Sequence, residues 1–271
     1  PIDELSVNLI GYQNLRPHEL GEFRELLGKI GLKLISELPG ESSVDDWFNA
    51  FEAGVNIVSD LDVWPRTLAV LEGRGAHSLE LVQPVGTKNN LDFFTRLAAF
   101  FSSEEEMRLA LDEYRQRDSK ELAPLRERLK GIRLAYCIGS GKNYEASQVS
   151  GEGLGHINAF LELGLEVEIV IQERDDKTAH RRVQDSLGAL GIELPYMNFN
   201  DPGVLAPALL AGGYDIAYCL DHLKSQVDLA EVAFLRMGSL RPGIVSMVDN
   251  ARRILKALST DFETRYGRFS W

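Results

Sequence analysis

A glycine-rich turn with a lysine directly follows the apolar run IRLAYCI and consists of Gly139, Ser140, Gly141 and Lys142. Backbone amides in a turn behind a strand can hold an anion, and the lysine adds positive charge. The turn has neither the spacing of a phosphate loop nor that of the dinucleotide fingerprint G-x-G-x-x-G. It predicts either an anion-binding turn or an ordinary flexible connection between a strand and a helix.

The two cysteines, Cys137 and Cys219, occur in a repeated triplet, AYC, near the ends of two apolar runs. If those runs form adjacent strands, the thiols can face one another as a pair or as metal ligands. A tetrahedral metal site needs two more soft ligands, and none is evident in the sequence. Buried free cysteines in a core are the alternative. Two cysteines make no disulfide framework, so a reducing cytoplasm is the expected location.

Among the five histidines, His222 is the most suggestive of a site, because it stands beside Asp221 at the end of an apolar run. A histidine in a surface loop is the alternative. No pair of histidines has metal-binding spacing, and the sequence contains no G-x-S-x-G elbow, no recognisable pair of catalytic carboxylates and no EF-hand loop. These motifs therefore define no reaction.

The elements that must position these residues follow from apolar periods that switch repeatedly between strand-like and helix-like spacing. The alternation predicts an α/β fold with two consecutive Rossmann-like units, each a parallel sheet of about four strands with helices on both faces. We expect these domains over 1–102 and 131–245, a connecting helix over 103–130, and a C-terminal helix and tail over 246–271. The expected strands are 6–11, 32–38, 55–59, 78–82, 132–139, 166–173, 192–199 and 215–221.

Two of the expected helices carry further signals. The connecting helix is strongly charged, and Pro124 predicts a kink or a division within it. Its charge run is typical of a solvated face rather than of a binding tail. A further helix is predicted over 224–237.

In a doubly wound sheet the ligand crevice lies at the carboxyl ends of the strands, where the strand order reverses. If the order is 3-2-1-4, the first and fourth strands of each unit are neighbours. In the second unit this assumption joins the turn at 139–143 to the loop at 221–224. In the first unit it brings the loop after the first strand to the loop after the fourth. The expected pocket lining there is Gly11, Tyr12, Gln13, Asn14, Gln83 and Gly86.

The composition is that of a soluble globular protein, with 44% hydrophobic and 26% charged residues in a chain of 271. The net charge of −12 argues against nonspecific binding to nucleic acid, which needs clustered Lys and Arg. No apolar run approaches the ~20 residues that span a membrane. The first residues, PIDELS, have no initiator methionine and do not form a signal peptide. They are typical of a processed or excised piece.

The order of several stretches goes further than any single motif. VNLIGY is followed by LGEFRELLGKIGLKLISELPGESSVDDWFNAFEAGVNIV, by QPVGTKNNLDFFTRLAAFF, by ERLKGIRLAYCIGSGK and by FLRMGSLRPGIVSMVDNARRIL. This series resembles nitrogenase component 1-type proteins, which include molybdenum–iron protein chains, cofactor-scaffold relatives and subunits of dark-operative protochlorophyllide reductase. The resemblance covers most of the chain and corresponds to the middle and C-terminal domains of that family. A first domain, with the cysteines of the intersubunit cluster, would precede Pro1.

The resemblance implies site residues position by position. Where the catalytic family chain has a cluster-binding cysteine, this sequence has Asp60, or Ser59, and a carboxylate is a poor replacement for thiolate. The family's glycine-rich stretch near the cofactor corresponds to the turn at 139–142. Its cluster-binding histidine near the C-terminus has no counterpart after His222. The resemblance therefore implies that this chain alone binds no iron–sulfur cluster, although a metallocluster or tetrapyrrole is implied for the full complex.

Three hypotheses about function remain open. The first is a subunit of a multi-electron reductase or cofactor-assembly complex, inactive as a fragment, with a homologous component 1-type subunit and an ATP-dependent iron–sulfur reductase as partners. The second is a non-catalytic assembly or binding subunit, which the missing cysteine at Asp60 favours. The third is a two-domain enzyme that binds a nucleotide or nucleotide sugar at the turn around Lys142.

Overall fold

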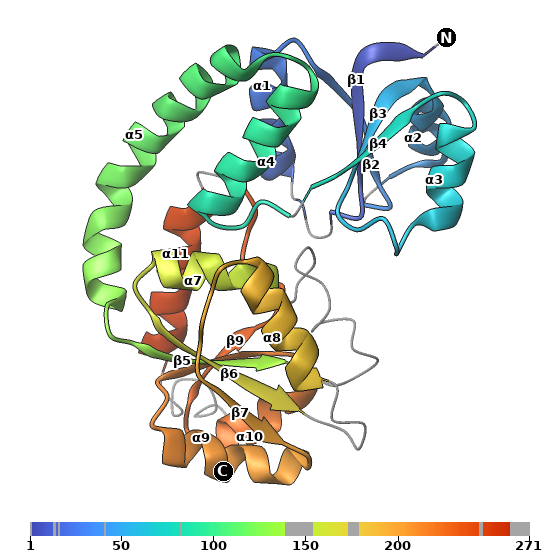
Figure 1. Cartoon of the computed structure of the whole chain (residues 1–271). Coiled ribbons are helices and arrows are strands. Elements are labelled where there is room, and N and C mark those ends of the chain that lie inside the picture. Colours follow the sequence, from blue (N-terminus) through green and yellow to red (C-terminus); the bar gives the residue numbers. More distant parts are fainter. Residues whose placement is uncertain are drawn as a thin grey trace, which may run out of the picture. The chain divides into compact units, whose positions relative to one another are not determined.

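The computed structural model describes residues 2–12, 15, 17–40, 42–81, 83–138, 154–172, 179–243 and 246–260. The chain divides into two units, drawn in Figure 1. Unit 1 comprises Pro1–Asp118 and Arg241–Ser246, and unit 2 comprises Ser119–Leu240 and Met247–Trp271.

Unit 1 is built on a parallel sheet of four strands in the order β2-β1-β3-β4. Its strands are β1 (Asp3–Ile10), β2 (Lys33–Leu38), β3 (Ala53–Val58) and β4 (His77–Glu80). Its helical elements are α1 (Pro17–Lys29), α2 (Val44–Asn49), the 3₁₀ turn η1 (Ala50–Glu52), α3 (Pro65–Glu72), α4 (Thr87–Phe100) and the first part of α5 (Glu104–Leu129). The expected α/β architecture with a parallel sheet is confirmed.

The strand order corrects the predicted crevice of this unit. β1 lies between β2 and β3, so β1 and β4 are not neighbours, and the order reverses between β1 and β3. The physical reason is burial. All six residues of β3 are buried, as a central strand of a parallel sheet requires, whereas β4 is partly exposed, which suits an edge.

Helices cover both faces of this sheet. On one face α1, α4 and α5 pack against the apolar side chains of β1 and β3, and Phe23, Phe93 and Phe94 form an aromatic cluster with ring centroids 5.0–5.6 Å apart. On the other face α3 and η1 pack against Ile10 and Val58. Ile10 and Val58 are also the last paired residues of β1 and β3, so Gly11 and Ser59 stand directly at the carboxyl ends of these strands.

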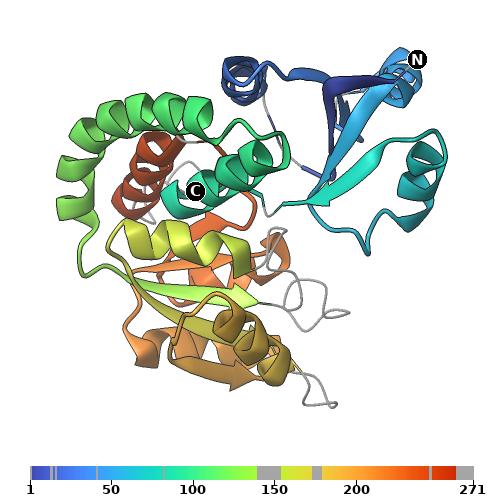
Figure 2. The ribbon, with the colours of Figure 1, turned by 45° about the horizontal axis from the view of Figure 1, so that its top comes forward.

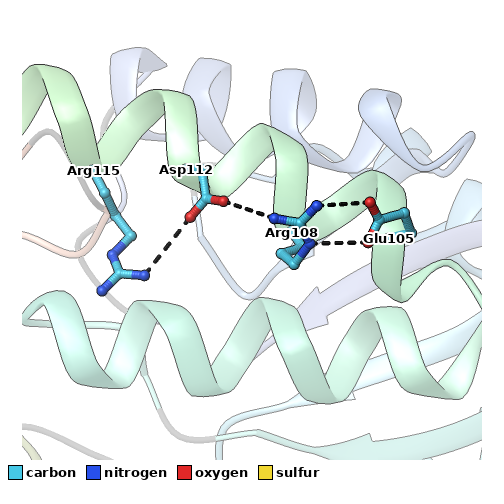
Figure 3. A network of polar contacts seen from close by, with 4 residues as sticks. All are labelled: Glu105, Arg108, Asp112 and Arg115. Atoms are coloured by element: carbon cyan, nitrogen blue, oxygen red, sulfur yellow. Dashed lines mark hydrogen bonds and ion pairs between the residues drawn. The ribbon is translucent and has the colours of Figure 1, made fainter.

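The helix α5 runs from Glu104 to Leu129 as one helix with Pro124 inside it, so the chain does not divide there. Figure 3 shows the polar face of its first turns, where Arg108 bonds both Glu105 and Asp112. Arg115 extends this row to Asp112 at 3.8 Å. The four side chains are all 43–67% exposed, so the predicted solvated charge run is confirmed for this part of the helix.

Unit 2 is built on a parallel sheet of five strands in the order β7-β6-β5-β8-β9. Its strands are β5 (Arg133–Ile138), β6 (Glu166–Gln172), β7 (Tyr196–Phe199), β8 (Ile216–Cys219) and β9 (Ala233–Arg236). Its helical elements are η2 (Leu154–His156), α7 (Ile157–Glu162), α8 (Ala179–Ala189), η3 (Pro202–Val204), α9 (Leu205–Gly212), η4 (Asp221–Leu223), α10 (Lys224–Leu229) and α11 (Ser246–Ser259). Here β5 and β8 are neighbours, as predicted.

The helices of unit 2 also lie on both faces of its sheet, as Figures 1 and 2 show. α9 and α10 pack on the face that carries Cys137 and Cys219, and α7 packs on the face that carries Tyr136 and Tyr218. None of the helices in the described ranges is long and apolar enough to cross a membrane.

The helix predicted over 224–237 is wrong in its second half. α10 ends at Leu229, and residues 233–236 form the edge strand β9 beside β8. Glu231 has φ 55°, a left-handed backbone that ends the helix and turns the chain into the strand.

Candidate functional site

The carboxyl ends of β1 and β3 meet at Gly11 and Ser59. The Ser59 amide donates to the Ile10 carbonyl at 3.0 Å, and the Ser59 hydroxyl donates to the Gly11 carbonyl at 3.0 Å. Gly11 has φ 80°, and a Cβ added there would lie 2.4 Å from Ser59 Oγ and 2.5 Å from Trp64 Nε1. The site therefore requires glycine, both for the backbone conformation and for the space that Ser59 and Trp64 occupy.

Asp60, which the resemblance is expected to place where the family has a cysteine, follows directly at this strand end. It is half-buried, and its carboxylate accepts a hydrogen bond from the Asp62 amide at 2.9 Å. The neighbouring Leu61 amide donates to Glu80 Oε1 at 3.1 Å. These hydrogen bonds hold the loop after β3, and the one to Asp60 uses a single carboxylate oxygen. The chemistry available here is that of a hard oxygen donor rather than of a thiolate.

The loop after β4 reaches this region through Tyr12. Its buried hydroxyl donates to the Leu81 carbonyl at 2.8 Å, although β1 and β4 are not paired. Burial is the main cause that raises the pKa of Tyr12 well above its ordinary value, and the carboxylate of Glu80 adds to the rise. Tyr12 is therefore neutral, and its hydrogen bond connects the loop after β1 to the loop after β4.

Gly86 precedes α4 with φ 94° and is buried. The side-chain amide of Asn90 donates to the carbonyls of Pro84 and Gly86 at 2.9 and 2.7 Å. These two hydrogen bonds fix the start of α4. Gly86 remains a proposed lining residue opposite Gly11, together with Gln83, which is buried.

Several predicted site residues lie outside the described residues. These are Gln13 and Asn14 in the first unit, and Gly139, Ser140, Gly141 and Lys142 in the second. Their roles stay predictions.

Cys137 and Cys219 lie on the adjacent strands β5 and β8 and face the same apolar core. Both are free and buried. A hydrogen bond with the Cys219 side chain is the largest cause that raises the pKa of Cys137 well above its ordinary value, and burial adds to the rise. Cys137 is therefore a protonated thiol in the core, which fits the packing alternative better than a thiolate ligand.

A buried polar pair that the sequence reasoning missed lies on the opposite face of the same strands. His156 Nδ1 lies 2.6 Å from the Tyr218 hydroxyl, which also accepts the Gly238 amide at 2.9 Å. Burial lowers the pKa of His156 to about 4, so the imidazole is neutral near pH 7. Its Nε2 is buried without a hydrogen-bond partner among the described residues. The sequence offers only a single histidine directly before the apolar stretch at 157–161, with no sign of its partner.

His222 lies in η4, directly behind β8, and is exposed. Its neighbour Asp221 pairs with Arg236 at 3.0 Å. The exposed position fits the surface-loop alternative, and any ligand role of His222 remains a prediction.

The described donor set does not fit a resident iron–sulfur cluster held by this chain alone. No three His, Cys, Asp or Glu side chains come together as metal ligands anywhere in the described part of the chain. The two cysteines are in the core of unit 2, and Asp60 stands at the strand ends of unit 1. Iron–sulfur clusters need several thiolates, and the residues described at these strand ends supply none.

Comparison with known sequences identifies relatives. A sequence profile for the family described as Nitrogenase component 1 type Oxidoreductase matches residues 2–201. The Nitrogenase iron-molybdenum cofactor biosynthesis protein NifE of Clostridium pasteurianum is 26% identical over 167 residues. That alignment covers 60% of this chain and 34% of the relative, so the chain matches about a third of the length of that curated protein.

Solved structures share the fold. A nitrogenase Cp1 chain at pH 5 superposes with a TM-score of 0.72 at 13% identity, and the alignment covers 98% of this chain and 58% of that one. A periplasmic metal binding protein from Candidatus Liberibacter asiaticus superposes with a TM-score of 0.54 at 9% identity, covering 94% and 100% of the two chains. At these identities the likeness concerns the fold alone.

Proposed function

This chain belongs to the nitrogenase component 1 type oxidoreductase family, and we propose that it serves in a cofactor-assembly complex of that family. In this role it is part of a subunit that lines a pocket for a metallocluster as cargo. The subunit pairs with a second component 1-type subunit and receives electrons from an ATP-dependent iron–sulfur reductase. The pocket lies at the β1–β3 strand ends and includes Gly11, Ser59 and Asp60.

The observation that carries this proposal is a half-buried oxygen donor, Asp60, just after the carboxyl end of β3. Asp60 is half-buried beside the Gly11–Ser59 contact, while both cysteines of the chain are buried in the other unit. Resident iron–sulfur clusters are held by thiolates, so a carboxylate at this place suits a cluster that is passed on. The similarity to a cofactor biosynthesis protein supports the same role. A resident catalytic cluster would need thiolates from outside this chain.

The test is anaerobic co-purification of the full-length protein that carries this chain with a co-expressed component 1-type subunit, followed by iron analysis. We expect a stable complex that contains iron and loses it to an apo-acceptor protein. A protein that purifies without partner and without iron would contradict the proposal.

Two variants locate the cargo on this chain. Asp60→Ala should lower the iron content of the complex about tenfold, as loss of one ligand or its support does in other metal sites. Asp62→Ala is the matched control, because that neighbouring carboxylate is exposed and the Asp60 interaction uses only its amide. Equal iron in both variants would remove Asp60 from any ligand role.

A further inference from the structure

A basic pocket of about 290 Å³ opens in unit 2 between β9 and the last turns of α11. Its lining residues are Lys224, Phe234, Leu235, Arg236, Ser239, Arg253, Lys256, Ala257 and Thr260. The lining contains cations from three elements and no acidic residue, although the chain as a whole has a net charge of −12. A local field of this sign attracts anions.

Two of the cations have acidic partners at the edge of the pocket. Arg236 Nε lies 3.0 Å from Asp221, and both side chains are largely exposed. Lys224 Nζ lies 2.5 Å from Asp228. The positive charges of Lys224 and Arg236 are therefore partly neutralised. The cations on the other side of the pocket should attract an anion more strongly.

That other side is formed by α11. The side chains of Arg253 and Lys256 stand one turn apart, and neither has an ion-pair partner among the residues that the structure describes. The helix dipole favours a cation at Lys256, in the last turn of α11. The helix dipole does not, however, provide a hydrogen-bond acceptor for Arg253. It therefore does not explain why this side chain has no ion-pair partner in the described part of the chain.

Two donors that line the pocket are buried without a hydrogen-bond partner in the described ranges. They are the guanidinium Nε of Arg253 and the hydroxyl of Ser239. Buried donors are nearly always paired in folded proteins, and an unpaired one is costly. An anion in the pocket would meet the exposed ammonium of Lys256 directly, whereas Arg253 and Ser239, whose buried donors have almost no accessible surface, would have to turn their side chains to reach it.

We propose that this pocket binds a small phosphate-bearing molecule. A phosphate group has several acceptor oxygens and a negative charge, which match the guanidinium and the ammonium that α11 contributes to the lining. The apolar lining residues Phe234, Leu235 and Ala257 give the remainder of such a molecule a surface to pack on. This site is separate from the β1–β3 strand ends and requires neither iron nor a partner subunit.

The test is isothermal titration calorimetry of the full chain with inorganic phosphate and with pyrophosphate, without partner or metal. We expect saturable binding with a Kd of about 1 mM or tighter, tighter for pyrophosphate and weaker as salt is added. Absence of binding for both anions would overturn the proposal. Tighter binding of citrate than of pyrophosphate would overturn the assignment to phosphate and indicate a carboxylate site.

Matched variants place the anion. Arg253→Gln and Lys256→Gln should each weaken pyrophosphate binding about tenfold. Arg252→Gln removes the same charge from the adjacent position, where the side chain is exposed and paired with Glu121 and Asp249, and should change affinity less than about twofold. Equal losses in all three variants would show a general charge effect and overturn the proposal. Lys256 is exposed, so its variant should fold normally even if Arg253→Gln does not.

Discussion

His156 Nδ1 and the Tyr218 hydroxyl form a buried contact of 2.6 Å that joins η2 to β8. The same hydroxyl accepts a hydrogen bond from the Gly238 amide. The Tyr218 hydroxyl therefore connects three segments that are distant in sequence. With Gly238 as donor to the phenol oxygen, the phenol proton is directed towards Nδ1, which favours the imidazole tautomer protonated on Nε2. The arrangement depends on a neutral histidine.

The first prediction is that His156 makes the protein acid-sensitive. Burial lowers its pKa from 6.5 to about 4. Below pH 6.5 the unfolded chain therefore binds a proton that the folded chain does not bind, so stability is full above that pH and is lost as the pH falls towards 4. Between about pH 7 and pH 5 this group alone should lower the free energy of unfolding by about 2 kcal/mol.

Urea unfolding at the two pH values measures this effect. In His156→Gln, which has no titrating ring, the part of the pH dependence due to this group should disappear. His222→Gln replaces an exposed histidine and should retain the wild-type pH dependence. If His156→Gln and wild type lose the same stability on acidification, the histidine is not the sensitive group.

The second prediction concerns Gly11. Gly11→Ala places a Cβ 2.4 Å from Ser59 Oγ on a backbone with φ 80°. The left-handed backbone costs about 1–2 kcal/mol and the overpacking about 1–3 kcal/mol. We expect a total loss of about 3 kcal/mol in denaturant unfolding.

Gly31→Ala is the control for that substitution. Gly31 has φ 75°, but an added Cβ there would meet nothing within 4 Å. It should lose only the backbone part, about 1 kcal/mol. Equal losses in the two variants would mean that the loop after β3 adjusts, and that the Ser59–Gly11 contact is not a rigid feature of the strand ends.

The sequence predicted the alternation of strands and helices well, because apolar period is a local property. The order of the strands was harder to predict, because it depends on the face of the sheet on which each crossover helix packs. The β5–β8 adjacency followed the predicted order, whereas β1 pairs with β3 rather than with β4. A local signal existed in the composition of the two strands: β3 is apolar except for Asn56 and fully buried, whereas β4 is mostly polar and partly exposed.

The buried polar pair escaped prediction for a related reason. A single histidine in an apolar context is typical of a core residue, and nothing nearby in the sequence marks its partner. Tyr218 lies 62 positions after His156, so only the folded sheet brings the two together. The expectation for Asp60 rests on the order of family motifs rather than on a local pattern, and its role as a ligand stays a prediction.

The third prediction tests a buried ion pair in unit 1. Glu19 in the first turn of α1 is 1% exposed, and its Oε1 lies 3.7 Å from Arg241 Nε. Arg241→Met leaves the carboxylate buried without this cation and should cost about 3 kcal/mol in the free energy of unfolding. Glu19→Met combined with Arg241→Met should recover most of that loss.

Denaturant unfolding of the single and double variants measures the coupling between the two residues. Arg24→Met provides the control, because Arg24 is an exposed cation on the same helix and should change stability little. A double variant that is as unstable as Arg241→Met would indicate that the loss comes from packing rather than from the missing Arg241 cation.

The fourth prediction concerns two buried amides on β1 and β3. Asn8 Nδ2 donates to Asn56 Oδ1 and to the Ala50 carbonyl, each at 2.9 Å, and both asparagines are fully buried. Within the described residues, Asn8 Oδ1 and Asn56 Nδ2 have no partner. The pair is therefore only partly satisfied, and an apolar pair of similar shape should fit at little cost.

A double-mutant cycle with leucine separates these terms. Each single variant, Asn8→Leu or Asn56→Leu, removes the hydrogen bond between the two amides. Each should lower the free energy of unfolding by about 1–3 kcal/mol. The double variant removes both amides, so its loss should fall below the sum of the single losses by about 1–2 kcal/mol. In Asn8→Leu the Ala50 carbonyl also loses one of its two donors and keeps only the Ala53 amide, so that variant should be the less stable of the two. Additive losses would mean that the amides are held by packing and not by their mutual hydrogen bond.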